Sequence, residues 1–203
     1  MHLKPVRISS KFFKELIIMD TLTALHSRIS SPRLTGEVSE EQLLNIYKAA
    51  LRAPDHAQLK PWRFLIIKAD GRNKLGDLFA QAALEENPEQ TAEMAEKARS
   101  KPLRAPIILV CIAKVVEHNV VPEIEQILSC GSAVQNMLLA AYAQGVGAMW
   151  RTGGMAYNDS VKKGLEIKTS EKIIGYLYLG QIDGRSKNVP VLDVDEYFAV
   201  WDG

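Results

Sequence analysis

Two stretches of the chain carry residue types that could hold an anionic ligand. Arg28 and Ser30 stand at the end of a segment with helical spacing, and Arg151 lies between a short apolar run and a pair of glycines. The planar guanidinium of arginine matches the oxygens of a phosphate, and glycine lets the backbone approach a ligand closely. An arginine at a helix end is also often only solvated, so the residues alone leave both interpretations open.

A third stretch, residues 52–62, places Arg52 and His56 in a loop that Pro54 and Pro61 make rigid. The imidazole can donate or accept a hydrogen bond at the polar edge of a ligand. The alternative is a loop histidine whose hydrogen bonds are satisfied by the backbone. Both interpretations remain open from the residue types.

Several function classes are excluded by what the sequence lacks. It contains no GxGxxG, GxxxxGK[ST] or GxSxG motif, and its four histidines do not have metal-ligand spacing. The net charge of +1 argues against a nucleic-acid or membrane-surface partner, and no apolar run approaches the roughly 20 residues that span a bilayer. Cys111 and Cys130 form no CxxC pair, so we expect a reducing, cytoplasmic compartment without a disulfide or zinc site.

The hydrophobic pattern predicts alternating helices and strands. With 203 residues, 47% of them apolar, the chain suits one α/β or α+β domain with helices on both faces of a sheet. Ser39 and Gln42 have the spacing of a capping box, and Asp20 or Thr21 can cap an earlier helix. The expected helices are 20–28, 39–53, 72–86, 89–100, 123–144 and 159–165, and the expected strands are 63–69, 107–113, 148–151 and 172–179.

The two ends of the chain show little periodicity. Residues 1–18 are basic with a short apolar end, and we expect a loosely ordered extension there, ahead of a domain spanning 19–203. Residues 181–203 are expected to wrap over a neighbouring molecule.

Four stretches taken together resemble the nitroreductase family, most closely its YdjA-like branch of small single-domain NAD(P)H nitroreductases. They cover the compact chain from about residue 19 to 185, and their order and spacing make the resemblance specific. The stretches are LHSRIS at 25–30, RAPDHAQLKPW at 52–62, AQGVGAMWRTG at 143–153 and IGYLYLG at 174–180.

The resemblance implies a mixed four- to five-stranded sheet flanked by helices, in an intertwined homodimer with FMN at the subunit interface. It implies ping-pong transfer of hydride from NAD(P)H through the flavin to a nitroaromatic, quinone or similar acceptor. No side chain acts as nucleophile or general base. The implied FMN contacts are Arg28, Ile29, Ser30, Arg52, His56, Trp150, Arg151 and Thr152, with Arg52 and His56 coming from the second subunit; the implied NAD(P)H contacts are Ala140, Ala141, Tyr142, Ala143, Gln144 and Gly145.

The chain departs from the branch at Ile29, where related members carry a second arginine; Arg33 is a candidate substitute. This departure keeps an alternative open, a flavin-binding or sequestering dimer without turnover, beside a structural dimer without cofactor. Trp150 could equally be a core residue, and residues 140–145 a buried helix end. Arg185 and Lys187 are further candidates for a phosphate contact, while the acceptor and the choice between NADH and NADPH are not encoded in any motif.

Overall fold

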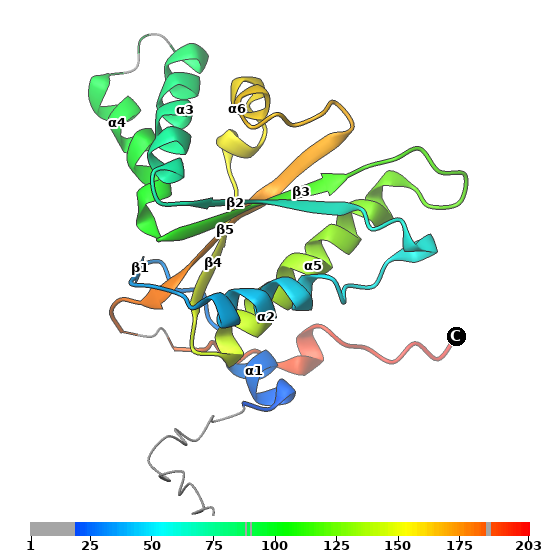
Figure 1. Cartoon of the computed structure of the whole chain (residues 1–203). Coiled ribbons are helices and arrows are strands. Elements are labelled where there is room, and N and C mark those ends of the chain that lie inside the picture. Colours follow the sequence, from blue (N-terminus) through cyan, green and yellow to red (C-terminus); the bar gives the residue numbers. More distant parts are fainter. Residues whose placement is uncertain (1–18, 88, 90, 186–187) are drawn as a thin grey trace, which may run out of the picture.

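The computed structural model describes residues 19–87, 89, 91–185 and 188–203, so the extension expected at 1–18 lies outside the described residues. Helices cover both faces of a central sheet (Figure 1). The helices are α1 (Thr21–Ser27), α2 (Glu40–Ala50), α3 (Gly71–Glu86), α4 (Ala92–Ser100), α5 (Glu123–Ala143) and α6 (Asp159–Gly164), and the strands are β1 (Leu34–Thr35), β2 (Trp62–Lys68), β3 (Ile107–Lys114), β4 (Gly147–Arg151) and β5 (Glu171–Ile182).

Local signals at the helix starts are confirmed. The Asp20 side chain accepts hydrogen bonds from the backbone N–H groups of Leu22 and Thr23 at the start of α1. Ser39 and Gln42 form the complete capping box of α2. Each cap satisfies backbone donors that have no partner inside the helix, so these two boundaries are set by short-range chemistry.

The sheet is organised around β5. This strand pairs with β1, β3 and β4, while β2 pairs with the far edge of β3. The predicted fold class, an α/β (α+β) arrangement of four to five strands flanked by helices, is confirmed. Every pair among the described strands is antiparallel, however, so the expectation of a mixed sheet is wrong for this chain.

The connections explain the antiparallel pairing. Two helices, α3 and α4, lie between β2 and β3 (Figure 1). They return the chain to the same end of the sheet at which β2 finishes, because Lys68 lies opposite Ile107. A single helix, α5, connects β3 to β4, so these two strands run in the same direction, as a one-helix crossover requires. They do not pair with each other because β5 lies between them.

Alternate residues of β5 serve two separate cores. Leu177 and Leu179 are fully buried in a core with residues of α2 and α5, whereas Tyr176 and Tyr178 are buried in a core with residues of α3, α4 and α6. Because successive strand residues point to opposite faces, the register of β5 decides which side chains reach each layer. None of the helices in the described part of the chain has the length and apolar character needed to cross a bilayer.

An ion pair connects the outer strand β2 to the start of β5. Arg63 donates from Nε and Nη2 to the two carboxylate oxygens of Glu171, both at 2.7 Å, and Glu171 is only 6% exposed. Glu171 also accepts from the backbone N–H of Lys168 at 3.0 Å. The hydrogen bond from Arg63 is the main reason why the pKa of Glu171 falls from 4.5 to about 2, against the opposing effect of burial.

We expect Glu171→Gln to lower the free energy of unfolding at pH 7 by roughly 1.5–3 kcal/mol, the range for hydrogen bonds to a charged group. Because the pKa is depressed in the folded state, the stabilisation is present above pH 4.5 and is lost as the pH falls toward 2. Urea unfolding followed by circular dichroism at pH 7 and pH 3 measures both effects. Glu123→Gln is the control, since Glu123 pairs with Lys172 at the surface and is 52% exposed. Equal losses in the two variants would contradict a special role for Glu171.

Candidate functional site

Three adjoining cavities form one groove at the end of β4. We call it the arginine groove, because Arg33, Arg104, Arg151 and Arg185 line it. The first has a volume of about 360 Å³, and the second, of about 560 Å³, shares Arg104 and Arg151 with it. The third, of about 190 Å³, shares Pro32, Arg33 and Asp183 with the second. The two larger volumes lie in the range of small-molecule sites, about 300–1,000 Å³, so the groove can accommodate an elongated ligand.

Strand alternation decides what Trp150 contributes to this groove. Its indole packs against the core that contains Leu177 and donates from Nε1 to the backbone oxygen of Ile174 at 3.2 Å. The neighbouring Arg151 points to the other face of the sheet, toward the ring of Tyr178. The Trp150 side chain is therefore half-buried against the core, and the residue also lines the first cavity.

Arg151 lies at the junction of the two larger cavities. Its Cζ is 5.2 Å from the centroid of the Tyr178 ring, and Nη2 donates to the backbone oxygen of Pro32 at 3.2 Å. Its Nε is buried and has no hydrogen-bond partner among the described residues. Burial, and then the nearby charge of Arg104, lower the pKa of Arg151. A buried donor without a partner is costly, so this position favours an acceptor from a ligand.

The turn after β4 exposes backbone to the first cavity. Gly153 has φ 120° and ψ −174°, which is a conformation essentially restricted to glycine. A Cβ placed on Gly153 or Gly154 would have no atom within 4 Å, so open space lies beside this backbone. Thr152, immediately before, is exposed. The turn can therefore approach a flat ligand closely.

The segment after α1 reaches the same groove. Arg28 is the C-cap of α1 and its Nη1 lies 3.5 Å from Ser30 Oγ, a long contact. Ile29, Ser30 and Arg33 line the third cavity, and the N–H of Ser31 donates to Ala148 of β4 at 3.0 Å. The structure thus places the segment after α1 beside the stretch 143–153. Arg185 lines the third cavity as well, whereas Lys187 lies outside the described residues.

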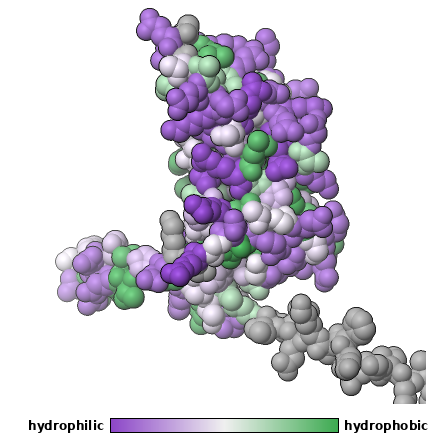
Figure 2. Space-filling model, turned by 90° about the vertical axis from the view of Figure 1, so that its left-hand side faces the viewer, coloured by the Kyte–Doolittle hydropathy of each residue, from purple (hydrophilic) through white to green (hydrophobic). Residues whose placement is uncertain are grey.

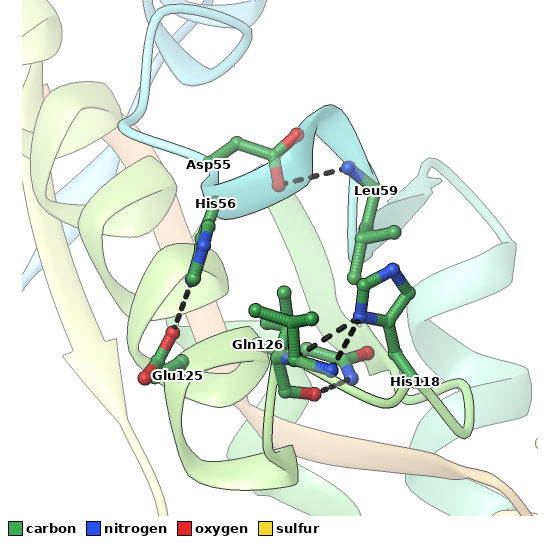
Figure 3. A network of polar contacts seen from close by, with 8 residues as sticks. Asp55, His56, Leu59, His118, Glu125 and Gln126 are labelled. Carbon is green, nitrogen blue, oxygen red and sulfur yellow. Dashed lines mark hydrogen bonds and ion pairs between the residues drawn. The ribbon is translucent and has the colours of Figure 1, made fainter.

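Arg52 and His56 lie elsewhere. Figure 3 shows His56, in the loop that precedes β2, and Glu125, near the start of α5, pointing toward one another; His56 Nδ1 and Glu125 Oε2 are 2.7 Å apart. Asp55 holds the loop by accepting from the N–H groups of Leu59 at 3.1 Å and Lys60 at 2.7 Å. Neither Arg52 nor His56 lines the arginine groove. Their contribution from a second subunit stays a prediction.

Residues 140–145 form the C-terminal turn of α5 and its cap. Ala141 is buried, and its oxygen accepts from the N–H of Val146 at 2.9 Å. The Gln144 side chain connects α5 to α2, because its Oε1 accepts from Asn45 Nδ2 at 3.0 Å and its Nε2 donates to the backbone oxygen of Gln42 at 3.4 Å. On another side of this helix end, Ala140 and Ala143 line a cavity of about 490 Å³ together with Arg52. The NAD(P)H contacts of Ala140, Ala141, Tyr142, Ala143, Gln144 and Gly145 stay a prediction.

Two cations of the groove were missed by sequence reasoning. Lys101 and Arg104 belong to a 3₁₀ turn, Lys101–Arg104, between α4 and β3. Their position just before a buried strand is the signal that could have identified them. The aromatic side chains beside them, Phe79, Tyr176 and Tyr178, are 2–3% exposed and come from helix and strand positions that the sequence marks as core.

The cysteines do not add a nucleophile. Cys111 and Cys130 are both fully buried. Burial raises the pKa of Cys130 to about 12 and that of Cys111 further. The thiolate is the reactive form of cysteine, so neither thiol attacks a substrate at neutral pH.

Comparison with known proteins gives a consistent assignment. The model of the nitroreductase family matches residues 34–181. YdjA of Escherichia coli (strain K12), whose name assigns it to the NAD(P)H nitroreductases, is 40% identical over 163 residues, or 80% of this chain and 88% of YdjA. A Haemophilus influenzae protein with the same assignment is 31% identical over 182 residues, or 88% of this chain and 98% of its own.

Solved structures show the same fold. A nitroreductase-like protein from Bacillus cereus superposes with a TM-score of 0.80 at 22% identity, covering 91% of this chain and 97% of its own. An FMN-dependent nitroreductase from Clostridium difficile R20291 superposes with a TM-score of 0.64 at 22% identity, covering 90% and 99%.

Gly175 provides a test of the packing that positions β4. Its φ is +151°, and a Cβ there would lie 2.1 Å from Trp150 Nε1 and 2.8 Å from the oxygen of Arg151. We expect Gly175→Ala to lower the free energy of unfolding by roughly 1–3 kcal/mol through overpacking, measured by urea unfolding. Gly184→Ala is the matched control, since Gly184 has φ +109° with no atom within 4 Å of its Cβ position. The close packing of Trp150 over Gly175 would be disproved by equal losses in both variants.

Proposed function

The chain belongs to the nitroreductase family and is an oxidoreductase, and on that premise we propose that it uses FMN to transfer hydride from NAD(P)H to a nitroaromatic, quinone or similar acceptor. The observation that carries the proposal is the arginine groove, in which a buried guanidinium nitrogen of Arg151 has no partner among the described residues. The order of events is ping-pong, so NAD(P)⁺ leaves before the acceptor binds.

The phosphate of FMN suits the end of the groove nearest α1. Arg28, Ser30 and Arg33 supply two guanidinium groups and a hydroxyl, and charge-assisted hydrogen bonds of this kind are the strong ones. Arg33 takes the place of the second arginine that the branch carries where this chain has Ile29, and both Ile29 and Arg33 line the same cavity. The donor set therefore fits a phosphate despite the replacement.

The flavin ring suits the other end of the groove, at the backbone of Trp150, Arg151 and Thr152. Gly153 and Gly154 leave open space beside this backbone, so a flat ring can approach it. Bound FMN supplies the two-electron redox chemistry that no side chain of the protein provides. The cation of Arg151 stabilises negative charge that develops on a ring beside it, and the Tyr178 ring holds that cation in place.

A second copy of the chain completes the site in this proposal. Arg52 and His56 reach the flavin from the partner subunit, which explains why they lie outside the groove of their own chain. Exposed apolar side chains support such an interface: on α5, Ile124 is 59% and Leu128 is 62% exposed. The segment after β5 leaves the body of the molecule (Figures 1 and 2), and it carries exposed apolar residues, among them Val191, Phe198 and Trp201. Contact with a partner would remove these surfaces from water.

The redox proposal is tested with the purified, full-length protein. We expect a yellow protein with a flavin spectrum whose visible absorption bleaches when NADH or NADPH is added under argon, and recovers when a quinone or nitroaromatic follows. A yellow protein that neither nucleotide bleaches would instead be a flavin-sequestering module. A colourless protein that fails to take up added FMN would eliminate both functions.

The proposed contact between Arg28 and the phosphate of FMN is tested with Arg28→Ala. We expect the dissociation constant of FMN to rise roughly ten- to hundredfold, which corresponds to the loss of one hydrogen bond to a charged group. Quenching of flavin fluorescence during titration measures it. Lys48→Ala, which removes a charge from the exposed surface of α2, serves as control and should bind FMN as the unaltered protein does. Unchanged FMN affinity in Arg28→Ala would remove Arg28 from the site.

A further inference from the structure

His56 and Glu125 form a contact that lies outside the arginine groove. His56 belongs to the loop before β2, and Glu125 belongs to the first turn of α5. Figure 3 shows the two side chains pointing toward one another, with His56 Nδ1 at 2.7 Å from Glu125 Oε2. These side chains are 52% and 44% exposed. The imidazole is therefore held by its own subunit and is at the same time open to another molecule.

The carboxylate decides which nitrogen of His56 carries the hydrogen. An ionised carboxylate only accepts hydrogen bonds, so Nδ1 must donate to it. In a neutral imidazole one nitrogen is a donor and the other an acceptor, which leaves Nε2 as the acceptor. Within the part of the chain that the structure describes, Nε2 has no hydrogen-bond partner. Neutral histidine in water favours the opposite tautomer, with the hydrogen on Nε2, so the contact with Glu125 imposes the less common form.

A second histidine near the start of α5 has the reverse arrangement. His118 lies in the connection between β3 and α5 (Figure 3). Its Nδ1 accepts from the backbone N–H groups of Val120 at 3.2 Å and Val121 at 3.1 Å. The hydrogen of the neutral ring must therefore be on Nε2. The two imidazoles are expected in opposite tautomers, and His118 serves as an internal reference for His56.

The backbone of the loop around His56 is fixed. The Asp55 carboxylate accepts from the N–H groups of Leu59 at 3.1 Å and Lys60 at 2.7 Å. Ala57 has a φ of 58°, a conformation that a residue other than glycine keeps only where the surrounding structure imposes it. The loop therefore presents the imidazole in a defined place, and the hydrogen bond at Nδ1 sets the direction of the ring.

We propose that Glu125 is a positioning residue, which holds the neutral ring of His56 with its hydrogen on Nδ1 so that Nε2 accepts a hydrogen bond from FMN. This inference rests on the proposed function for the placement of His56 at the flavin of the partner subunit. FMN offers suitable donors in the N3–H of its ring and the hydroxyl groups of its ribityl chain. With the hydrogen on Nε2 instead, the N3–H could not pair with it, and a hydroxyl would have to turn and accept.

Nitrogen-15 NMR of the full-length protein, labelled at histidine and free of FMN, tests the tautomer directly. Couplings between the ring nitrogens and the carbon-bound protons distinguish the two tautomers, and the chain has only four histidines. At alkaline pH, with the rings neutral, we expect the hydrogen on Nδ1 in His56 and on Nε2 in His118. The His56→Gln variant identifies the His56 signals. In Glu125→Ala these signals should change to those of the Nε2–H form, while the His118 signals stay as they are.

The consequence for the cofactor is measured by quenching of flavin fluorescence. We expect Glu125→Ala to raise the dissociation constant of FMN roughly three- to tenfold, as the weakening of one hydrogen bond predicts. In a His56→Ala background the same substitution should change that constant by less than about twofold, because Glu125 acts through the imidazole. Glu123→Ala is the matched control and should bind FMN as the unaltered protein does, since Glu123 lies in the same turn of α5 and pairs with Lys172 instead.

Hydrogen on Nε2 of His56 in the unaltered protein, or an unchanged tautomer in Glu125→Ala, would overturn the inference. An equal loss of FMN affinity with and without the His56 side chain would overturn it as well. Unchanged FMN affinity in Glu125→Ala, beside weakened binding in Arg28→Ala, would overturn it and leave the proposed phosphate contact intact. A protein with the expected tautomer and FMN affinities that neither NADH nor NADPH bleaches would overturn the redox proposal alone, because neither measurement uses a nicotinamide nucleotide.

Discussion

Hydrogen bonding along both edges of β5 sets the position of the groove residues that lie on β4 and β5. On one edge β4 pairs with it, so that Met149 lies opposite Tyr178 and Arg151 opposite Tyr176. On the other edge β3 pairs with the same residues of β5. A slip of one residue would turn Arg151 into the core with α5 and Trp150 into the groove, because successive side chains alternate between faces. The chemistry of the site therefore depends on this register.

Glycines make this close pairing compatible with the large side chains nearby. A Cβ at Gly147 would lie 2.5 Å from Leu34, and one at Gly180 would lie 2.7 Å from Pro106. The indole of Trp150 occupies the space that a side chain at Gly175 would need. The sheet is thus closely packed at these three glycines, and the turn that follows β4 continues from this packed region to the groove.

Charge is the second organising feature, and it is left unbalanced where a ligand would bind. Elsewhere in the sheet, Arg63, Lys68 and Lys172 each form an ion pair with an acid. In the groove, Arg33, Arg104 and Arg151 have among their lining neighbours only Asp183 to oppose them. Bringing like charges together costs free energy that an anionic ligand offsets. Stability and binding are thereby coupled, since ligands that bind only the folded state increase its stability.

Short-range chemistry made much of the fold and part of the site predictable from the sequence alone. Caps such as Asp20 and the Ser39–Gln42 pair involve residues within one helical turn, and the apolar run of β3 signals burial on both faces without knowledge of its neighbours. The family pattern likewise identified Ser30 and Arg151, which the structure brings to one groove. Strand direction, the inward side of Trp150 and the gathering of Lys101 and Arg104 beside Tyr178 could not be read in advance. They depend on contacts between residues far apart in the chain, whose register and crossover only the folded sheet determines.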